Sequence, residues 1–471
     1  MNIKTILQFS IGPIGAAALS LVTLPFVAWF FSVEDVGRLT MLQVVLGLSV
    51  SFFSLAMHQA YVREYHEEED KKALFKISVL PGLITLILVS VIILVLPFSF
   101  SKLLFGIDSL LLTFLLLIGV FASFFINFLA HLIRMEERGL AFSATQITPK
   151  LFLLVFVSLI MLLNLTAEFK TLMLMNTLAV TFSLLVFAWL TKGTWVVALT
   201  KSVNITLLKR MLSFSLPLVA GGVAYWGLTT MDRFFLRSLA GFEELGVYAL
   251  SAALAGAVSV VSTIFSNLWH PTLYKWVKAG IDHNKVQRVI DHMVIGVALI
   301  WSIVGIFSFI VPWFLPKEYQ AVEYLIVACA SMPLFYLLSE TTGVGIGITR
   351  RSKYSMLASV LAFLVNALLN YILIPNYGAS GAALATVIAF FVFFVIRTEA
   401  SSWLWCSLPR VKIYILTLAY ISATSVMVLT KATIAHFYVV WLVLLFGTGF
   451  LYAARLSETV KFLRHYFKKR V

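Results

Sequence analysis

The stretch FSLPLVAGGVAYWGLTTMDRFFLRSLAGFEELGVY, Phe214 to Tyr248, opens with roughly twenty residues that are long and apolar enough to cross a bilayer. Asp232 and Arg233 stand side by side before the run ends. Neighbours on a helix point about 100° apart, so we expect these two side chains not to satisfy each other directly. An arginine at membrane depth costs at least about 2.5 kcal/mol, which favours a partner or a hydrated cavity inside a helical bundle. The alternative is a pair near the outer end of the helix, with Arg233 reaching the head groups.

The composition excludes a water-soluble globular protein. Hydrophobic residues make up 61% of the 471-residue chain and charged residues 12%, with a mean hydropathy of +0.99. The net charge of +14 is distributed between apolar runs, which indicates membrane orientation and anionic lipid and not nucleic acid. The two cysteines, Cys329 and Cys406, lie far apart in or beside apolar runs and indicate neither a disulfide nor a metal site.

The apolar runs predict an all-α polytopic membrane protein with about fourteen transmembrane helices. The runs lie near 9–31, 37–60, 76–98, 109–131, 141–163, 171–191, 212–236, 246–268, 289–311, 320–343, 353–374, 379–397, 411–430 and 435–456. Lys and Arg concentrate about four to one in the loops on one side, which the positive-inside rule assigns to the cytoplasm. Both termini are therefore predicted to be cytoplasmic.

Two segments of the first third recur near the middle of the chain. Leu7-Gln8-Phe9-Ser10 followed by Pro13 matches Leu212-Ser213-Phe214-Ser215 followed by Pro217, and Glu34-Asp35-Val36-Gly37 matches Glu243-Glu244-Leu245-Gly246. A repeat with an even number of crossings is parallel, with its axis along the membrane normal. We expect an N-terminal six-helix lobe over 1–200, a C-terminal six-helix lobe over 201–400, and two additional helices with a basic tail over 401–471.

The segment Gly347 to Thr386 carries a family resemblance. Its basic cluster, Asn366 and Asn370, Ile374-Pro375, Tyr377-Gly378 and Gly381-Ala382-Ala383 closely resemble the corresponding part of bacterial polysaccharide flippases. The likeness extends to Ala60-Tyr61-Val62-Arg63-Glu64-Tyr65, Asp232-Arg233-Phe234-Phe235 and Leu315-Pro316-Lys317-Glu318-Tyr319, so that it covers about the first 400 residues. These flippases belong to the multidrug/oligosaccharidyl-lipid/polysaccharide exporter (MOP) superfamily and include the Wzx-type O-antigen flippases.

The resemblance implies a transporter of the bacterial inner membrane and not an enzyme. Its substrate would be an undecaprenyl-diphosphate-linked oligosaccharide, an O-antigen (lipopolysaccharide) or other surface polysaccharide unit, moved from the cytoplasmic to the periplasmic leaflet by alternating access. Membrane lipids, a polysaccharide polymerase and a chain-length regulator are the partners that such a role implies. A lipid II flippase and a cation-coupled multidrug exporter are the alternatives within the superfamily, and a membrane-embedded polymerase or ligase is a distant one.

Asp232 and Arg233 are candidates for lining the substrate cavity, and two further basic residues are candidates for binding the diphosphate. Lys150 is the deepest basic residue of the first half, directly after Pro149, and the alternative is a lysine that snorkels along its helix. Arg63 follows the second run and would meet the substrate at the cytoplasmic mouth; the alternative is a solvated loop paired with the acidic residues after it.

The second half adds three polar candidates. Asn366 and Asn370 share a helix face, where they would bind sugar hydroxyls or, as we favour, bond neighbouring helices. Glu340 would bind a coupling cation or, as we favour, pair with Arg350 or Arg351; Asp232 is the other candidate for ion coupling or gating. The chain has no G-x-x-x-x-G-K-[ST] motif and no predicted cofactor or metal, so a Na⁺ or H⁺ gradient is the energy source we consider.

Overall fold

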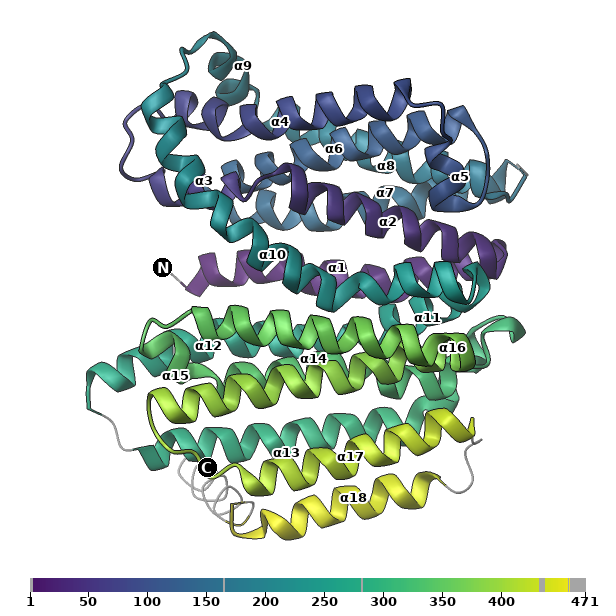
Figure 1. Ribbon diagram of the computed structural model, residues 1–471, viewed down its shortest axis with the longest axis vertical. Coiled ribbons are helices and arrows are strands. Elements are labelled where there is room, and N and C mark those ends of the chain that lie inside the picture. Colours follow the sequence, from purple (N-terminus) through teal and green to yellow (C-terminus); the bar gives the residue numbers. More distant parts are fainter. Residues whose placement is uncertain (1–2, 164–165, 281–282, 432–436, 456, 458–471) are drawn as a thin grey trace, which may run out of the picture. The chain divides into compact units, whose positions relative to one another are not determined.

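The computed structural model describes residues 3–163, 166–280, 283–431, 437–455 and 457. The described residues form helices and no strands, in agreement with the predicted all-α class (Figure 1). Twelve helices in this part of the chain are long and apolar enough to span a membrane, and Tyr438–Leu451 is a shorter apolar helix. The chain is therefore a polytopic all-α membrane protein.

The chain divides into two compact units, Met1–Ala249 and Leu250–Val471. The predicted division at residues 200 and 400 follows the sequence repeat and stays a prediction. The helices up to the boundary are α1 (Ile3–Phe30), α2 (Val33–Phe53), α3 (Met57–Glu64), α4 (Lys71–Val95), α5 (Phe100–Phe105), α6 (Leu110–Met135), α7 (Gly139–Leu162), α8 (Phe169–Leu190), α9 (Lys192–Thr200), α10 (Ile205–Leu239) and α11 (Phe242–Ala255), which contains the boundary.

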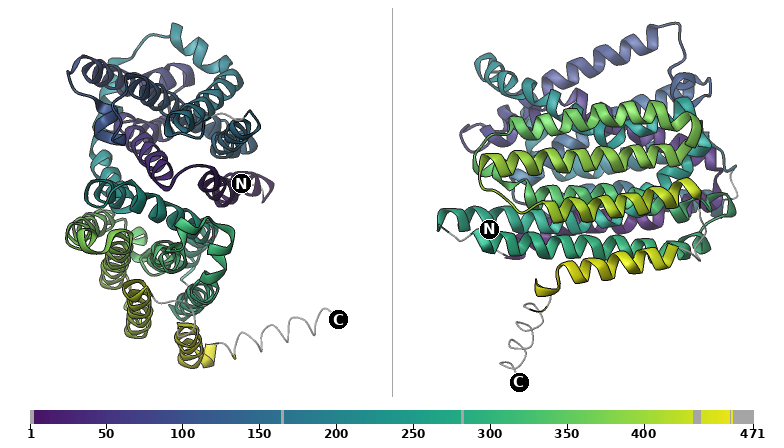
Figure 2. Two further views of the ribbon diagram at one scale, coloured as in Figure 1. Left: turned by 90° about the vertical axis from the view of Figure 1, so that its right-hand side faces the viewer. Right: turned by 60° about the horizontal axis from the view of Figure 1, so that its bottom comes forward.

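The second unit continues with η1 (Gly256–Val258), α12 (Ser259–Lys278), α13 (His283–Phe307), η2 (Ser308–Phe314), η3 (Lys317–Tyr319), α14 (Val322–Thr342), α15 (Val344–Ile348), α16 (Lys353–Leu404), α17 (Val411–Thr430) and α18 (Phe437–Leu451). Its long helices lie side by side, with α14 packed against α13 and α16 (Figure 2). The helix α14 is the core of this unit, since nearly all of its residues are buried.

The predicted and observed helices agree at one break and differ at another. The helix α16 comprises the predicted runs 353–374 and 379–397 as two limbs that meet at a kink at Gly378, where the backbone is non-helical with a φ of 52°. The run 37–60 is instead divided between α2 and α3, because Leu55 and Ala56 adopt left-handed φ values of 48° and 51°. Left-handed backbone is costly for residues with a Cβ, so tertiary packing has to stabilise this break.

Polar side chains fix where the helices of the first unit begin. Ser32 Oγ accepts a hydrogen bond from Asp35 N at 3.1 Å, and the Asp70 carboxylate accepts bonds from the backbone of Lys72 and Ala73. Asn204 caps α10 in the same way. These caps satisfy backbone donors that a helix start leaves without partners.

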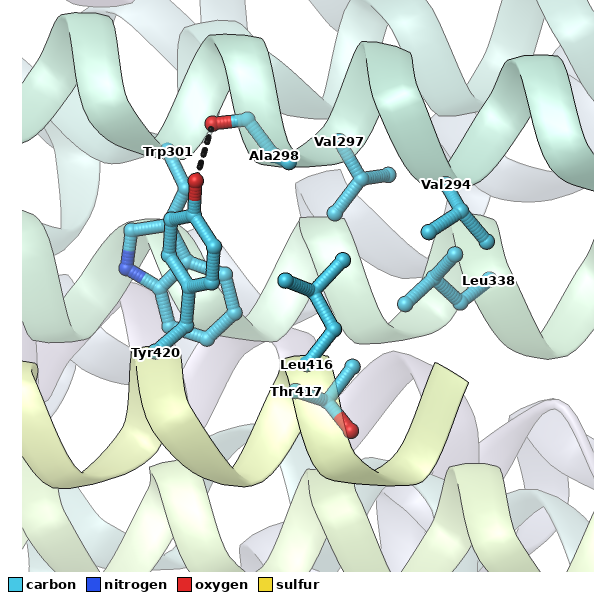
Figure 3. Close-up of a pocket in the computed structure, with 8 residues that line it drawn as sticks. All are labelled: Val294, Val297, Ala298, Trp301, Leu338, Leu416, Thr417 and Tyr420. Carbon is cyan, nitrogen blue, oxygen red and sulfur yellow. Dashed lines mark hydrogen bonds between the residues drawn. The ribbon is translucent and has the colours of Figure 1, made fainter. Parts of the chain in front are cut away.

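The interior of the second unit is closely packed between α13, α14 and α17. The cavity there measures only about 10 Å³ and is lined by apolar side chains together with Thr417 and Tyr420 (Figure 3). The Tyr420 hydroxyl lies 2.8 Å from Ser302 Oγ and donates to the carbonyl of Ala298 at 3.2 Å. A void of this size has room for about one water molecule, so it is a packing defect and not a ligand site.

Candidate functional site

Lys150 lies at the middle of α7, where its ammonium group binds α1. Its distance from either end of Gly139–Leu162 corresponds to about 16–18 Å along the helix. Its Nζ donates to the carbonyl of Ala16 at 2.9 Å and to the hydroxyl of Ser20. The snorkelling alternative therefore does not describe this lysine, whose charge stays at mid-helix.

The close contact of α1 with α7 brings these groups together. A Cβ at Gly12 would lie 2.9 Å from the Ser143 Cα, and one at Gly15 would lie 2.7 Å from Ile147 Cδ1. Ser143 Oγ accepts from Gly12 N and donates to the Gln8 carbonyl, so the hydroxyl bridges two groups that are four residues apart in α1. Small residues allow helix backbones to approach closely in membranes, and here they bring Lys150 within reach of α1.

Lys150 has only neutral oxygen partners in the described part of the chain. Both acceptors are uncharged, and no carboxylate of the described residues lies within ion-pairing distance of Nζ. The side chain is partly buried. No carboxylate offsets an ammonium in this setting, which favours an anionic ligand over a cationic one.

Asp232 and Arg233 lie on α10, about two turns before its last residue. Asp232 is only 3% exposed; it accepts hydrogen bonds from Arg233 N at 2.8 Å and from the Tyr248 hydroxyl of α11. Arg233 Nη1 lies 3.5 Å from the Asp232 carboxylate and donates to the Thr229 carbonyl at 3.0 Å. The expectation that the two neighbours do not satisfy each other is wrong, because one carboxylate oxygen receives both the backbone and the guanidinium of Arg233.

The helix α10 packs along α2 and α3, and charged groups bond its first turns to α3. Arg210 Nη2 is 2.5 Å from carboxylate oxygens of both Glu64 and Glu68. Arg63, 56% exposed, places its guanidinium 4.4 Å from the ring centre of Phe214 and 3.8 Å from Glu64. Arg63 therefore pairs with its neighbour Glu64 inside α3, and not with the acidic stretch 66–70 that the alternative interpretation named, and its side chain stays exposed.

The start of α2 contacts the start of α11 through one glycine from each helix. A Cβ at Gly37 of α2 would lie 2.1 Å from the Phe242 carbonyl, and a Cβ at Gly246 of α11 would lie 2.3 Å from the Val33 carbonyl. Gly37 and Gly246 occupy equivalent places in the sequence repeat.

The Arg38 guanidinium lies beside the contact between Gly37 and Gly246, where it pairs with two carboxylates. Its guanidinium bonds Glu34 at 2.6 Å and Asp35 at 2.8 Å, and it lies 5.0 Å from the ring centre of Phe242. We call Gly37, Arg38, Phe242 and Gly246 the outer latch. The latch holds the start of α11 against the start of α2.

In the second unit, Asn366 and Asn370 lie on the first limb of α16 and are both 0% exposed. Asn370 Nδ2 donates to Asn366 Oδ1 at 2.9 Å, and Asn366 Nδ2 lies 3.4 Å from Thr386 Oγ1 on the second limb. Asn370 Oδ1 has no hydrogen-bond partner in the described residues. Asn366 thus bonds the two limbs of the hairpin and Asn370 bonds Asn366 within the first limb, as expected for side chains that hold helices together.

Glu340 of α14 is the centre of a buried ionic cluster. Its carboxylate is 2.5 Å from Arg397 Nη1 of α16 and 3.1 Å from His270 Nε2 of α12. The predicted partners Arg350 and Arg351 are wrong. The chain passes through α15 and a left-handed turn at Arg350 before it reaches them, whereas the second limb of α16 packs directly on α14.

The glycine run Gly343-Val344-Gly345-Ile346-Gly347 allows this packing. A Cβ at Gly345 would lie 2.7 Å from the Ser401 carbonyl, and one at Gly343 would lie 3.3 Å from Arg397 Nε. Gly345 N donates to Ser401 Oγ at 2.8 Å. The run therefore brings α15 against α16, close to the Glu340 cluster.

Several partners could not be named from the sequence. Ser20, Tyr248, Arg397 and His270 each bond a predicted residue from a different helix. The only signal in the sequence was the rarity of polar side chains in apolar runs, which does not identify a partner. No group of three or more His, Cys, Asp or Glu side chains that would hold a metal occurs among the described residues.

Comparisons with known proteins agree on family and fold. The family model for polysaccharide biosynthesis proteins matches residues 3–277. A solved structure described as the lipid II flippase MurJ in an inward closed conformation superposes with a TM-score of 0.67 at 15% identity, covering 96% of this chain and 99% of that one. No curated protein matches the chain by sequence.

Multidrug resistance MATE family transporters of the MOP superfamily share the fold as well. An inward-facing structure gives a TM-score of 0.56 at 14% identity, covering 85% of this chain and 98% of that one. An outward-facing structure gives 0.53 at 16% identity, covering 85% and 95%. The similar proteins are transporters and a flippase.

Proposed function

Because the chain belongs to the polysaccharide biosynthesis protein family, we propose that it is a flippase for an oligosaccharide linked to a polyprenyl diphosphate. The lipid would enter from the cytoplasmic leaflet, and its head group would cross to the other leaflet by alternating access of two helical lobes. The observation that carries the proposal is Lys150, a mid-helix ammonium with only neutral partners in the described chain. The ammonium would stabilise a diphosphate at a depth where lipid alone offers no positive charge.

The state of the carboxylates supports an anionic substrate. A cation-coupled multidrug exporter needs carboxylates that are free to bind cations. Asp232 is bonded by Arg233 and Tyr248, and Glu340 by Arg397 and His270. These two acidic side chains of the spanning helices are thus neutralised, which weakens the multidrug alternative.

Lipid II is the second candidate, because the MurJ-like fold covers nearly the whole chain. It shares the prenyl chain and the diphosphate with the proposed substrate and differs in its head group. Competition between lipid II and an oligosaccharide-linked lipid for the purified protein would separate the two.

The experiment that tests the proposal is binding of undecaprenyl diphosphate to the purified full chain in detergent. A hydrogen bond to a charged group contributes about 1.5–3 kcal/mol, so Lys150→Met should weaken binding about 10- to 100-fold, and Lys150→Arg should retain most of it. Lys170→Met, which removes an exposed lysine of α8 in the same unit, is the matched control. Equal affinity of Lys150→Met and the unaltered protein would refute the role of Lys150.

A further inference from the structure

A larger cavity lies in the first unit, and Lys150 is not among the residues that line it. It measures about 480 Å³, and all but one of its lining side chains are apolar, contributed by α4, α6, α8 and α9. Phe75, Val79, Phe125, Leu184, Ala188 and Ala198 form its walls. We call this cavity the α9 groove. Its volume exceeds that of the packing void in Figure 3 many times over.

The α9 groove opens among side chains that face lipid. On α4, Leu88 is 58% exposed, and on α8, Leu185 and Trp189 are 58% and 68% exposed. Both helices are long and apolar enough to span a membrane. In that setting the molecules available to fill an apolar groove are hydrocarbon chains, and each buried CH₂ group favours the filled state.

The short helix α9 covers one end of the groove and is fastened there. It lies beside the first turns of α4 (Figure 1). Lys76 Nζ of α4 donates to the carbonyls of Leu199 and Lys201 at 2.9 and 2.6 Å, and Trp195 Nε1 donates to the Ala188 carbonyl at 2.8 Å. Leu199 is 64% exposed, as expected for a helix that lies at a membrane surface.

The rim of the groove is basic. Lys201 is neutralised by Asp70 at 2.8 Å. Lys76 is bonded to carbonyls, and Lys192 is exposed beside the Trp189 ring at 5.6 Å; neither pairs with a carboxylate of the described residues. Lys76 lines the cavity, and Lys192 begins α9, whose Trp195 also lines it, so two positive charges lie at this end of the groove and complement a lipid with an anionic head group.

From the groove, its cover and its rim we infer that the α9 groove binds an anionic glycerophospholipid of the leaflet on the basic side. One acyl chain fills the space between α4 and α8, and the phosphate lies at Lys76 and Lys192. The site is separate from the proposed transport function, which does not need it. A bound lipid would stabilise α9, which directly precedes α10.

The test is native mass spectrometry of the delipidated full chain titrated with phosphatidylglycerol or with phosphatidylcholine of the same chains. One phosphatidylglycerol should bind, and Ala188→Trp, which fills the groove, should abolish this binding. Leu88→Trp, on the exposed face of α4 and outside the lining, should keep it. Lys192→Gln should weaken phosphatidylglycerol about fivefold and leave phosphatidylcholine unchanged, since each lysine near a head group contributes about 1 kcal/mol.

Equal binding of the two lipids, or unchanged binding by a folded Ala188→Trp variant, would overturn the site. Lys192 is exposed, so Lys192→Gln is expected to fold even if the groove-filling variant does not. Unchanged phosphatidylglycerol affinity in Lys192→Gln would contradict the inference. Displacement of the bound phosphatidylglycerol by undecaprenyl phosphate at lower concentration would also contradict it, because the groove would then belong to the substrate's tail.

Discussion

Replacement of Gly37 by alanine tests whether the outer latch is a closed gate. The new methyl carbon would lie 2.1 Å from the Phe242 carbonyl oxygen. Non-bonded carbon and oxygen atoms need more than about 3 Å, so α2 and α11 have to separate locally by about 1 Å or more. The obstacle is backbone, which cannot rotate away as a flexible side chain would.

The cost follows from the size of this overlap. Extra atoms in a close-packed contact typically cost about 1–3 kcal/mol. If the contact exists only when the latch is closed, the same energy favours the open state by about 5- to 150-fold. Gly246→Ala meets the Val33 carbonyl at 2.3 Å and should act in the same direction. The double variant should be less than additive, because one separation relieves both overlaps.

The assay is the rate at which an introduced cysteine reacts with a membrane-impermeant maleimide. Leu245 is 0% exposed and precedes Gly246, so Leu245→Cys in a Cys406→Ser background reports opening of the latch. Gly37→Ala should raise the labelling rate at least about fivefold. Gly296→Ala, where a Cβ has no atom within 4 Å, is the control and should leave the rate unchanged. An unchanged rate with Gly37→Ala would refute the gate.

Three further outcomes are expected. Glu340→Gln leaves the Arg397 charge buried without its carboxylate and should lower the free energy of unfolding by about 3–5 kcal/mol. In a thermal unfolding assay, the further change Arg397→Met should restore part of this stability. No loss of stability in Glu340→Gln would argue against the pair. The pKa of the Asp70 carboxyl is lowered, chiefly by its bond to Lys201. The contribution of ionised Asp70 to the free energy of unfolding is therefore complete above the unfolded pKa of about 3.9, and it is lost as the pH falls through the lower folded value. In a plot of the unfolding midpoint against pH, Asp70→Asn should therefore reduce the fall of the midpoint at acid pH. An unaltered fall would contradict this. An exposed Ser457→Cys should react with impermeant maleimide in inside-out vesicles only, and labelling in right-side-out vesicles would reverse the proposed topology.

The sequence predicted those features that depend on local composition. Hydrophobic runs locate the helices because a bilayer requires about twenty apolar residues and internally satisfied backbone. The turn at Gly378 was also predictable from the Gly and Pro residues around it. The division of α16 into two limbs therefore agrees with two separate predicted runs.

Partners across helices could not be predicted from the sequence. Arg397 bonds Glu340 because the second limb of α16 packs on α14, and Ser20 bonds Lys150 because glycines bring α1 against α7. Neither contact follows from periodicity along one helix. The break at Leu55 and Ala56 was missed for a similar reason, since those residues have no preference for left-handed backbone.

The measurement that tests the central claim most directly is transbilayer movement of a fluorescent oligosaccharide linked to undecaprenyl diphosphate in proteoliposomes. An impermeant quencher reports how fast the labelled lipid leaves the protected leaflet. The account predicts movement well above that of protein-free liposomes, its loss in Lys150→Met and its retention in Lys170→Met. Movement no faster than in protein-free liposomes, or equal movement by Lys150→Met and the unaltered protein, would contradict it.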